Sequence, residues 1–426
     1  MTIPRLDLRF RVPSPELLAL PWRERLGAWD ATEVAVRDIP VGPSRHLVRF
    51  VEADDRLWAL KEMPLPVAIK EYEVLRELER RALSAVRAAG LVIQPFPDTA
   101  ILVTHFLERS WQYRRLLMRV PTSMRRHRER LLEAIATLLV DLHRNGVYWG
   151  DCSLANTLFR RDGQELQAWL VDAETAEIHT VLSDGQRDLD LQIMVENIAG
   201  GLLDVAARLD EPEDVYDQLI AEAEGVVNRY HVVWELLHEA PVVELHERDQ
   251  VQARLRRLND RGFAVDEVQL EPAGDAADDV SLRMRVAVGG RTFHAGRLRE
   301  LTGLEVGEGQ ATILLNDLEA HHRRLAEQRQ ATVTDEEAAR SWLTDVFSPG
   351  MERAVRAVGG VGDPVQAYCD LLEVRWLLSE EAGADVGDGP ALDALARRAA
   401  PSESAATIGI VDVTTRELPV IQGPSS

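Results

Sequence analysis

Five residues in the first half of the chain carry side chains that together could transfer a phosphoryl group from a nucleotide. They are Lys61, Glu71, Asp151, Asn156 and Asp172. In that chemistry a lysine places a point charge on the phosphates, a glutamate holds the lysine, and an aspartate accepts the proton of the acceptor hydroxyl. An asparagine and a second aspartate hold Mg²⁺. We therefore expect Lys61, Glu71 and Asp151 to be catalytic, and Asn156 and Asp172 to be metal ligands.

Lysine usage singles out Lys61. Of the 49 basic residues, 47 are arginine and only two, Lys61 and Lys70, are lysine. Arginine is a poor substitute where one compact charge with three donors must fit between phosphates and a carboxylate. The pattern favours a functional Lys61, whereas Lys70 is interpreted as a solvated helix residue.

The residues around this lysine predict two antiparallel strands. His46–Glu52 (HLVRFVE) and Leu57–Lys61 (LWALK) alternate or run apolar, and the acidic pair Asp54-Asp55 between them is typical of a hairpin turn. A further buried strand is predicted over Ala100–Phe106 (AILVTHF). The lysine would then lie on one strand of a sheet.

The helix that follows these two strands supplies the candidate partner of the lysine. It is predicted to begin at Pro66 and to be closed by Gly90. Glu71 lies on its apolar stripe, because apolar residues recur at three- and four-residue steps around it. Glu73 and Glu77 are alternatives, but they share a face with arginines nearby, which is typical of a solvated face. The sequence favours Glu71 and leaves Glu73 open.

Polar residues then gather around two short predicted strands. A helix over about 125–144 ends at Asn145-Gly146, and the loop Gly150–Asn156 follows it. Strands are predicted over Thr157–Phe159 and Ala168–Val171, and Asp172 comes directly after the second. The two strands would bring three polar side chains to one edge. The ordinary alternative is a turn in which aspartate and asparagine side chains cap the backbone.

These segments resemble the protein-kinase-like superfamily. Lys61 in WALK is similar to its strand lysine, and Asp172 in VDAE to its metal-binding aspartate. Asp151 and Asn156 in GDCSLAN are similar to its catalytic loop. The phrases SRHLVRF, ALKE, WGDCSLANTLFRRDG and VDAET, over about 40–200, look most similar to the lipopolysaccharide-kinase-type branch. They also resemble an actinobacterial family that joins such a domain to a C-terminal domain of unknown function.

The resemblance implies ATP and Mg²⁺ as cofactors and a hydroxyl group of a protein, sugar, lipid or metabolite as the acceptor. It also implies that a hinge segment contacts adenine through backbone groups; this segment comprises Thr104, His105, Phe106 and Leu107. No G-x-G-x-x-G loop is present, and Val41–His46 takes its place. Ser44 and Arg45 in that stretch would cover the phosphates less completely than a glycine-rich loop.

Other departures separate the chain from regulated protein kinases. Trp149-Gly150 replaces the His-Arg pair that precedes the catalytic aspartate, and Ala173-Glu174 replaces Phe-Gly after the metal-binding aspartate. These changes indicate an atypical or small-molecule kinase. The alternative is a catalytically weak or inactive kinase-like protein that binds or acts as a scaffold.

Three residues near the catalytic loop have less specific signals. Asp188 and Asp190 lie where kinase-like folds begin a helix beneath that loop, so one of them is expected to bond its backbone. The alternative is an acidic helix start that favours the helix dipole. Cys152 lacks the basic neighbour that marks a nucleophile, and we interpret it as a packing residue.

Charge and composition limit the classes of partner. The formal net charge is −22, which argues against broad binding of nucleic acids or anionic membranes. One basic cluster stands out: Arg114, Arg115, Arg119, Arg125, Arg126, His127, Arg128 and Arg130. It is interpreted either as a solvated helix face or as a local dock for an anionic ligand. With two cysteines and no long apolar segment, we expect a cytoplasmic protein without a membrane span.

The expected fold class is α+β, with a bilobal kinase-like fold followed by a smaller α+β domain. The kinase-like domain would span 1–240, with an N-lobe over about 30–106 and a C-lobe over about 107–240. A second domain over 241–400 and a flexible tail over 401–426 would follow. Trp342, Tyr368 and Trp376 are expected in the core of the second domain, whose role the sequence does not indicate.

Overall fold

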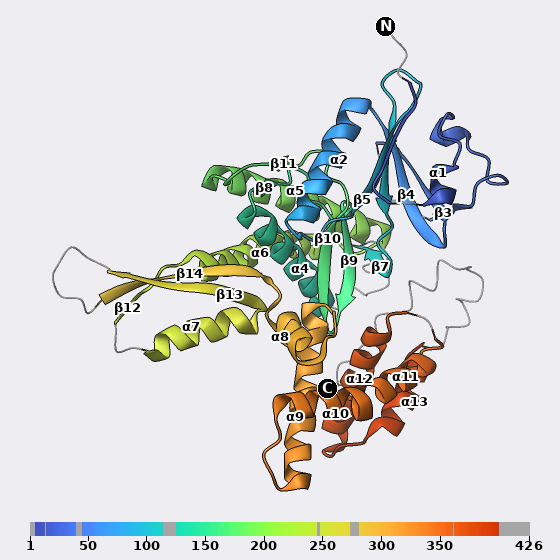
Figure 1. Ribbon diagram of the computed structural model, residues 1–426. Helices are drawn as coiled ribbons and strands as arrows, with labels where there is room; N and C mark the ends of the chain where they lie inside the picture. The colour runs from blue at the N-terminus through green and yellow to red at the C-terminus, as the bar shows by residue number, and fades with distance from the viewer. Residues whose placement is uncertain are drawn as a thin grey trace. The chain divides into compact units, whose positions relative to one another are not determined.

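The computed structural model of the chain describes residues 5–12, 14–39, 45–113, 125–244, 248–272, 281–360 and 362–399 (Figure 1). The chain divides into two compact units. The first contains Met1–Arg160 and Gln167–His231, and the second contains Arg161–Leu166 and Val232–Ser426. The mixture of helices and sheets in both units confirms the predicted α+β class.

The strands of the first unit begin near the N-terminus and continue to residue 178. They are β1 (Asp7–Phe10), β2 (Val36–Arg37), β3 (Leu47–Ala53), β4 (Arg56–Met63), β5 (Ala88–Ile93), β6 (Ala100–His105), β7 (Ser110–Gln112), β8 (Val147–Tyr148), β9 (Thr157–Asp162), β10 (Glu165–Leu170) and β11 (Glu177–Ile178). Its helices are α1 (Pro15–Leu18), a 3₁₀ turn (Leu26–Ala28), α2 (Leu65–Arg80), α4 (Arg125–Arg144), α5 (Asp184–Arg208) and α6 (Asp214–His238), the last of which continues into the second unit.

An antiparallel sheet of six strands forms the N-lobe, in the order β1-β5-β6-β4-β3-β2. The predicted hairpin is β3–β4, and its turn residues Asp54 and Asp55 both have positive φ, as a tight hairpin turn requires. Strand β4 pairs with β3 on one side and β6 on the other. Lys61 is therefore fixed on a central strand.

The N-lobe contains more strands than the sequence predicts. Gly90 does not close a helix, because α2 ends at Arg80 and Gly90 lies in β5. A Cβ atom at this glycine would lie 2.6 Å from the Phe10 ring, so the pairing of β1 with β5 requires a glycine there. The core of the sheet also includes Trp22 and Trp29 from the N-terminal segment, which extends the lobe beyond the predicted start near residue 30.

The C-lobe combines three long helices with two small sheets. Helices α4, α5 and α6 account for most of its length, and Pro212 lies in the break between α5 and α6. The sheets have the orders β10-β9-β7 and β11-β8. Asp151 and Asn156 lie in the loop between β8 and β9, and Asp172 follows β10.

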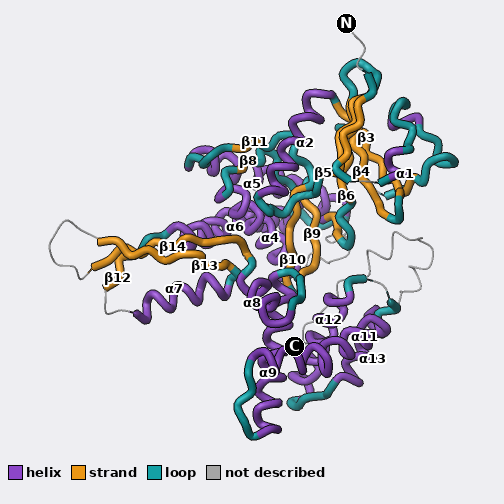
Figure 2. Tube along the Cα trace, in the orientation of Figure 1, coloured by secondary structure: helices purple, strands orange, loops and turns teal. Residues whose placement is uncertain are grey.

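The second unit contains one antiparallel sheet and a set of helices (Figure 2). Its elements are β12 (Val242–Glu244), α7 (Arg248–Asp260), β13 (Phe263–Pro272), β14 (Ser281–Arg291), α8 (Phe293–Thr302), α9 (Glu308–Arg329), α10 (Asp335–Trp342), a π-helical turn (Leu343–Phe347), α11 (Ser348–Ala357), α12 (Pro364–Ala382) and α13 (Asp388–Ala399). The sheet order is β12-β14-β13, and α7 packs against β13.

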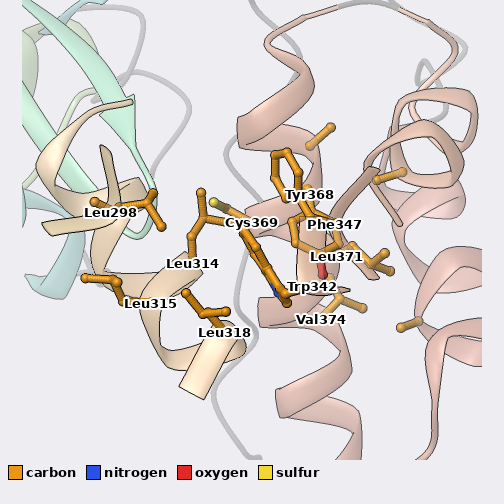
Figure 3. Close-up of a cluster of buried hydrophobic side chains, with 14 of the residues drawn as sticks. Leu298, Leu314, Leu315, Leu318, Trp342, Phe347, Tyr368, Cys369, Leu371 and Val374 are labelled. Carbon is orange, nitrogen blue, oxygen red and sulfur yellow. The ribbon is translucent and has the colours of Figure 1, made fainter. Parts of the chain in front are cut away.

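The helices α8 to α13 share one hydrophobic core (Figure 3). Trp342 is fully buried, with its ring stacked 4.9 Å from that of Phe347, which in turn contacts Tyr368 edge-on. Trp342 and Tyr368 thus lie in the core as expected. Trp376 does not: 59% of it is exposed, because its position on α12 turns it away from the core.

Candidate active site

Lys61 lies at the centre of the candidate site, on β4. Its Nζ lies 3.0 Å from Oε2 of Glu71 and 2.9 Å from Oδ2 of Asp172. Oε2 of Glu174 is 3.9 Å away. The structure thus brings Lys61 together with its predicted partner Glu71 and with Asp172, the predicted metal ligand.

The apolar stripe of α2 fixes the choice of glutamate. Glu71 is 1% exposed and lies on the buried face of the helix, whereas Glu73 is exposed to solvent. Glu77 pairs instead with Arg81 at 2.5 Å, one turn further along the helix. Oε1 of Glu71 also accepts a hydrogen bond from the Ala173 amide at 3.3 Å. Glu71 therefore joins Lys61 to the segment that follows β10.

Burial and the charge of the partner residue shift the pKa of Glu71 in opposite directions, and the same holds for the pKa of Lys61. Burial raises the pKa of Glu71 to about 7, and Lys61 opposes that rise by favouring the carboxylate. The pKa of Lys61 is raised, because the attraction of Glu71 and Asp172 outweighs burial, which by itself would lower it. The ammonium is therefore charged at neutral pH, while the glutamate titrates near neutrality.

Asp151 is held by two amide side chains. Its Oδ2 accepts from Nδ2 of Asn156 at 2.9 Å, and its Oδ1 accepts from Nδ2 of Asn197 at 3.0 Å. Burial raises the pKa of Asp151 above its ordinary value, and the two amides oppose the rise. An aspartate with a raised pKa is a stronger proton acceptor, which suits a general base.

The sequence prediction missed Asn197. It lies on α5, 46 residues from Asp151, and its amide also donates to the Cys152 carbonyl at 3.2 Å. An asparagine in a helix interior has no local signal of function, so only the long-range packing of α5 against the loop reveals it. Cys152 is fully buried, and burial raises the pKa of its thiol well above the ordinary value, which agrees with a packing role.

Asp190 accepts hydrogen bonds from the backbone at the start of the loop that carries Asp151, as predicted for one of the two acids near the start of α5. It accepts hydrogen bonds from the amides of Trp149 at 2.7 Å and Gly150 at 2.9 Å, and His143 Nε2 lies 3.1 Å from it. It is completely buried, whereas Asp188 is exposed. A single carboxylate therefore orders the backbone just before Asp151.

Trp149, which stands where kinases have a histidine, also has a structural connection to the site. Its indole Nε1 donates to the Asp172 carbonyl at 3.1 Å, and its own carbonyl accepts from the Thr175 hydroxyl at 2.8 Å. The fully buried ring ties the catalytic loop to the segment after β10. The sequence indicated only that the usual residue was absent.

The predicted hinge segment, Thr104 to Leu107, overlaps the end of β6. Thr104 and His105 are its last residues, and Phe106 and Leu107 follow. The His105 amide donates to the Arg87 carbonyl at 2.9 Å, and the Phe106 amide donates to the Leu57 carbonyl at 3.2 Å. Since both N–H groups already have partners within the protein, a nucleotide contact here would fall to other backbone groups of the segment.

The stretch that replaces the glycine-rich loop is described only in part. Ser44 lies outside the described residues, whereas Arg45 is exposed and close enough to Asp151 to lower its pKa, against the larger effect of burial. His46 Nε2 lies 3.0 Å from Oε2 of Glu174. Lys70 is exposed, and its Nζ donates to the Glu174 carbonyl at 3.1 Å.

The donor atoms around Asp172 fit a hard divalent cation. The side-chain amide nitrogen of Asn156 donates to Asp151, so the side-chain oxygen of Asn156 points away from that carboxylate. Asp172 supplies a carboxylate whose side chain is 30% exposed. Mg²⁺ prefers such oxygens, with the rest of its shell supplied by phosphates and water. Within the described ranges, no group of three or more acidic, histidine or cysteine side chains forms a self-sufficient metal site. The residues therefore fit a metal that arrives with a nucleotide.

In the described part of the basic cluster, Arg128 fits neither a solvated helix face nor an anion dock. Arg128 is not on a solvated face: it is 3% exposed, and its guanidinium forms two hydrogen bonds with Glu222 of α6, at 2.7 and 2.9 Å. Such a paired guanidinium cannot dock an anion. Arg130 is exposed. Arg114, Arg115, Arg119 and the side chains of Arg125, Arg126 and His127 lie outside the described residues.

Two protein-family models match separate parts of the chain. Residues 53–208 match the model of the lipopolysaccharide kinase (Kdo/WaaP) family, and residues 232–398 match a domain of unknown function, DUF4032. These matches confirm the resemblance drawn from the motifs. No curated protein matches the chain.

One solved structure among the matches is "WaaP in complex with acyl carrier protein". It has 17% sequence identity and a TM-score of 0.32, and the match covers 55% of this chain and 98% of that one.

No helix in the described part of the chain is both long and apolar enough to cross a membrane.

Proposed function

We propose that the chain is an ATP- and Mg²⁺-dependent phosphotransferase that acts on a hydroxyl group. The observation that carries the proposal is the position of Lys61, within 3.0 Å of both Glu71 and Asp172. A partly buried lysine between a helix glutamate and a metal-binding aspartate is the arrangement that phosphoryl transfer requires. The match of residues 53–208 to a lipopolysaccharide kinase family supports the same reaction class.

The side chains divide the work as follows. Lys61, held by Glu71, places positive charge on the phosphates, and the segment from Thr104 to Leu107 contacts the base. Asp151, oriented by Asn156 and Asn197, accepts the proton of the acceptor hydroxyl as that oxygen bonds to the γ-phosphorus. The bond from the γ-phosphorus to the β–γ bridging oxygen breaks, and ADP leaves. Asn156 and Asp172 would hold Mg²⁺, which when bound neutralises charge on the phosphate oxygens.

A second candidate function is nucleotide binding without useful turnover. The stretch Val41–His46 in place of a glycine-rich loop favours it, because such a loop normally covers the phosphates during transfer.

Thermal unfolding with and without Mg-ATP, followed by a transfer assay, separates the two functions. The phosphotransferase proposal predicts a higher melting temperature with Mg-ATP and release of phosphate or ADP. The absence of any shift at millimolar ATP would rule out both functions. A shift without turnover would support the binding function alone.

A further inference from the structure

One hairpin connects the two proposed metal ligands and reaches into the second unit. Strand β9 begins at the residue after Asn156, and β10 ends two residues before Asp172. The tip of this hairpin, Arg161–Leu166, belongs to the second compact unit together with the chain from Val232 onward. The contacts of the tip therefore act on the hairpin whose two ends carry the proposed metal ligands Asn156 and Asp172.

Asp162 at the tip caps a long helix. Its Oδ2 accepts a hydrogen bond from the amide of Gly309 at 3.0 Å, and its Oδ1 accepts from the amide of Gln310 at 2.9 Å. These amides lie in the first turn of α9, whose own N-cap residue, Gly307, has no side chain to cap it. Burial raises the pKa of Asp162, and the two N–H donors oppose the rise. A carboxylate from 147 residues away thus replaces the usual cap.

Glycines allow the tip and the helix to approach this closely. A Cβ atom at Gly309 would lie 2.1 Å from the Asp162 carbonyl oxygen, and one at Gly307 would lie 2.2 Å from the Asp162 carboxylate. Gly163 has a φ of +63°, and its Cβ would lie 2.6 Å from the Gly309 carbonyl. A side chain at Gly163 or Gly309 would push the two backbones apart, and one at Gly307 would displace the Asp162 carboxylate.

Helix α12 holds the tip from a second direction. Gln366 accepts a hydrogen bond from the Gly163 amide at 2.9 Å and donates one to the Gly163 carbonyl at 2.9 Å. Arg161 forms a two-pronged pair with Asp370, at 2.7 and 3.2 Å. Both backbone polar groups of Gly163 and the side chain of Arg161 are therefore bonded to α12.

We propose that the second unit is a positioning element for phosphoryl transfer. By holding residues 161–166, it fixes the two strands of the hairpin and hence the relative placement of Asn156 and Asp172. A short hairpin is only marginally stable by itself, and an error of about 1 Å in a reacting group can cost roughly 10²-fold in rate. Asp162 is a positioning residue that acts through β9 and β10. This inference rests on the proposed function.

The test compares Asp162→Asn with Asp385→Asn in the full-length protein. The first substitution removes one of the two capping acceptors. The second removes charge from a pair with Arg375 at the end of α12, within the same unit but outside the tip. Hydrogen exchange is measured over residues 156–160 and 168–172, and kcat, the KM for ATP and the Mg²⁺ concentration for half-maximal rate are measured in parallel.

For Asp162→Asn we expect exchange in both peptides to become about 10-fold faster and kcat to fall about 10-fold, with more Mg²⁺ needed. The KM for ATP should stay within about 2-fold, because Lys61 and the hinge segment lie on other elements. Asp385→Asn should change none of these. A general loss of stability would instead accelerate exchange throughout and would not shift the Mg²⁺ requirement selectively.

Unchanged exchange in both peptides of a folded Asp162→Asn protein would overturn the inference. If Asp162→Asn does not fold, Gln366→Ala, which removes both bonds to Gly163, decides by the same readouts. If the wild type transfers no phosphate, the proposed function fails by itself. The exchange rates still determine whether the second unit holds the hairpin.

Discussion

At the residue scale, the candidate site depends on one lysine among many arginines. Lys61 fits between two carboxylates at 2.9 and 3.0 Å, a space suited to a compact ammonium with three donors. A planar guanidinium is larger and presents its donors in a fixed fork, so it would displace one of the two acids. The identity of this side chain therefore matters more than its charge.

Lys61→Arg is expected to lower kcat/KM for ATP by about 10²-fold or more, since the charge is kept but its position relative to the phosphates is lost. Lys70→Arg is the matched control, because Lys70 is exposed and an arginine there still has donors for the Glu174 carbonyl. Steady-state kinetics measures both. A Lys61→Arg enzyme as active as the wild type would contradict this role.

We expect Glu71 to make the proposed activity dependent on pH. Its ordinary pKa of 4.5 is raised to about 7, so as the pH falls through about 7 the carboxylate takes up a proton and Lys61 loses one of its two nearest anionic partners. The rate should therefore fall below about pH 7. In stability, the folded state binds this proton more tightly than the unfolded state, so the contribution of Glu71 decreases as the pH rises from about 4.5 to 7.

The variant Glu71→Gln mimics the protonated state at every pH. It should be slow throughout and should lose the part of the acid limb that Glu71 causes, as measured in pH–rate profiles of kcat/KM. An acid limb of the same shape in the wild type and the variant would show that another group controls it.

At the element scale, α5 supports the catalytic loop through Asp190. This buried carboxylate accepts two backbone hydrogen bonds and contacts His143. Asp190→Ala should reduce the free energy of unfolding by about 3 kcal/mol, because it leaves buried donors without partners. Asp188→Ala, two residues away and exposed, should change it by less than about 0.5 kcal/mol. Urea denaturation of both variants is the measurement, and equal losses would contradict the assignment.

At this scale, the sequence predicts some elements of the fold and misses the long-range contacts between them. Local patterns predict β3, β4, α2 and the loop that carries Asp151, because each depends on nearby residues. The apolar stripe of α2 is sufficient to favour Glu71. By contrast, Asn197 and the capping role of Asp162 depend on partners 46 and 147 residues away, which no local pattern encodes. The prediction that Gly90 closes a helix is wrong for the same reason, because the glycine is required by its contact with Phe10 of β1.

At the scale of the whole molecule, each unit has its own core and its own buried cysteine. Cys152 lies in the first unit and Cys369 in the core of the second, and both are buried and outside any disulfide. Trp342 fills the centre of the second core (Figure 3). The rates of thiol alkylation under native conditions therefore report the opening of the two units separately.

Trp342→Ala should destabilise the second unit by about 3–5 kcal/mol, because it leaves a large cavity in a packed core. Alkylation of Cys369 should then accelerate by about 10²-fold or more, and that of Cys152 by much less. Trp376→Ala, at an exposed position on the same set of helices, should leave both rates near those of the wild type. Equal acceleration at both cysteines would show that the units open together.

The transfer of labelled γ-phosphate by the wild type and by Asp151→Asn tests the central claim most directly. The substitution keeps the size of the side chain and removes its ability to accept a proton. We predict Mg²⁺-dependent turnover in the wild type, a loss of about 10²–10⁴-fold in the variant, and the same stabilisation of both proteins by Mg-ATP. Equal turnover in the two proteins, or none in the wild type with Mg-ATP bound, would contradict the assignment of a phosphotransferase with Asp151 as its base.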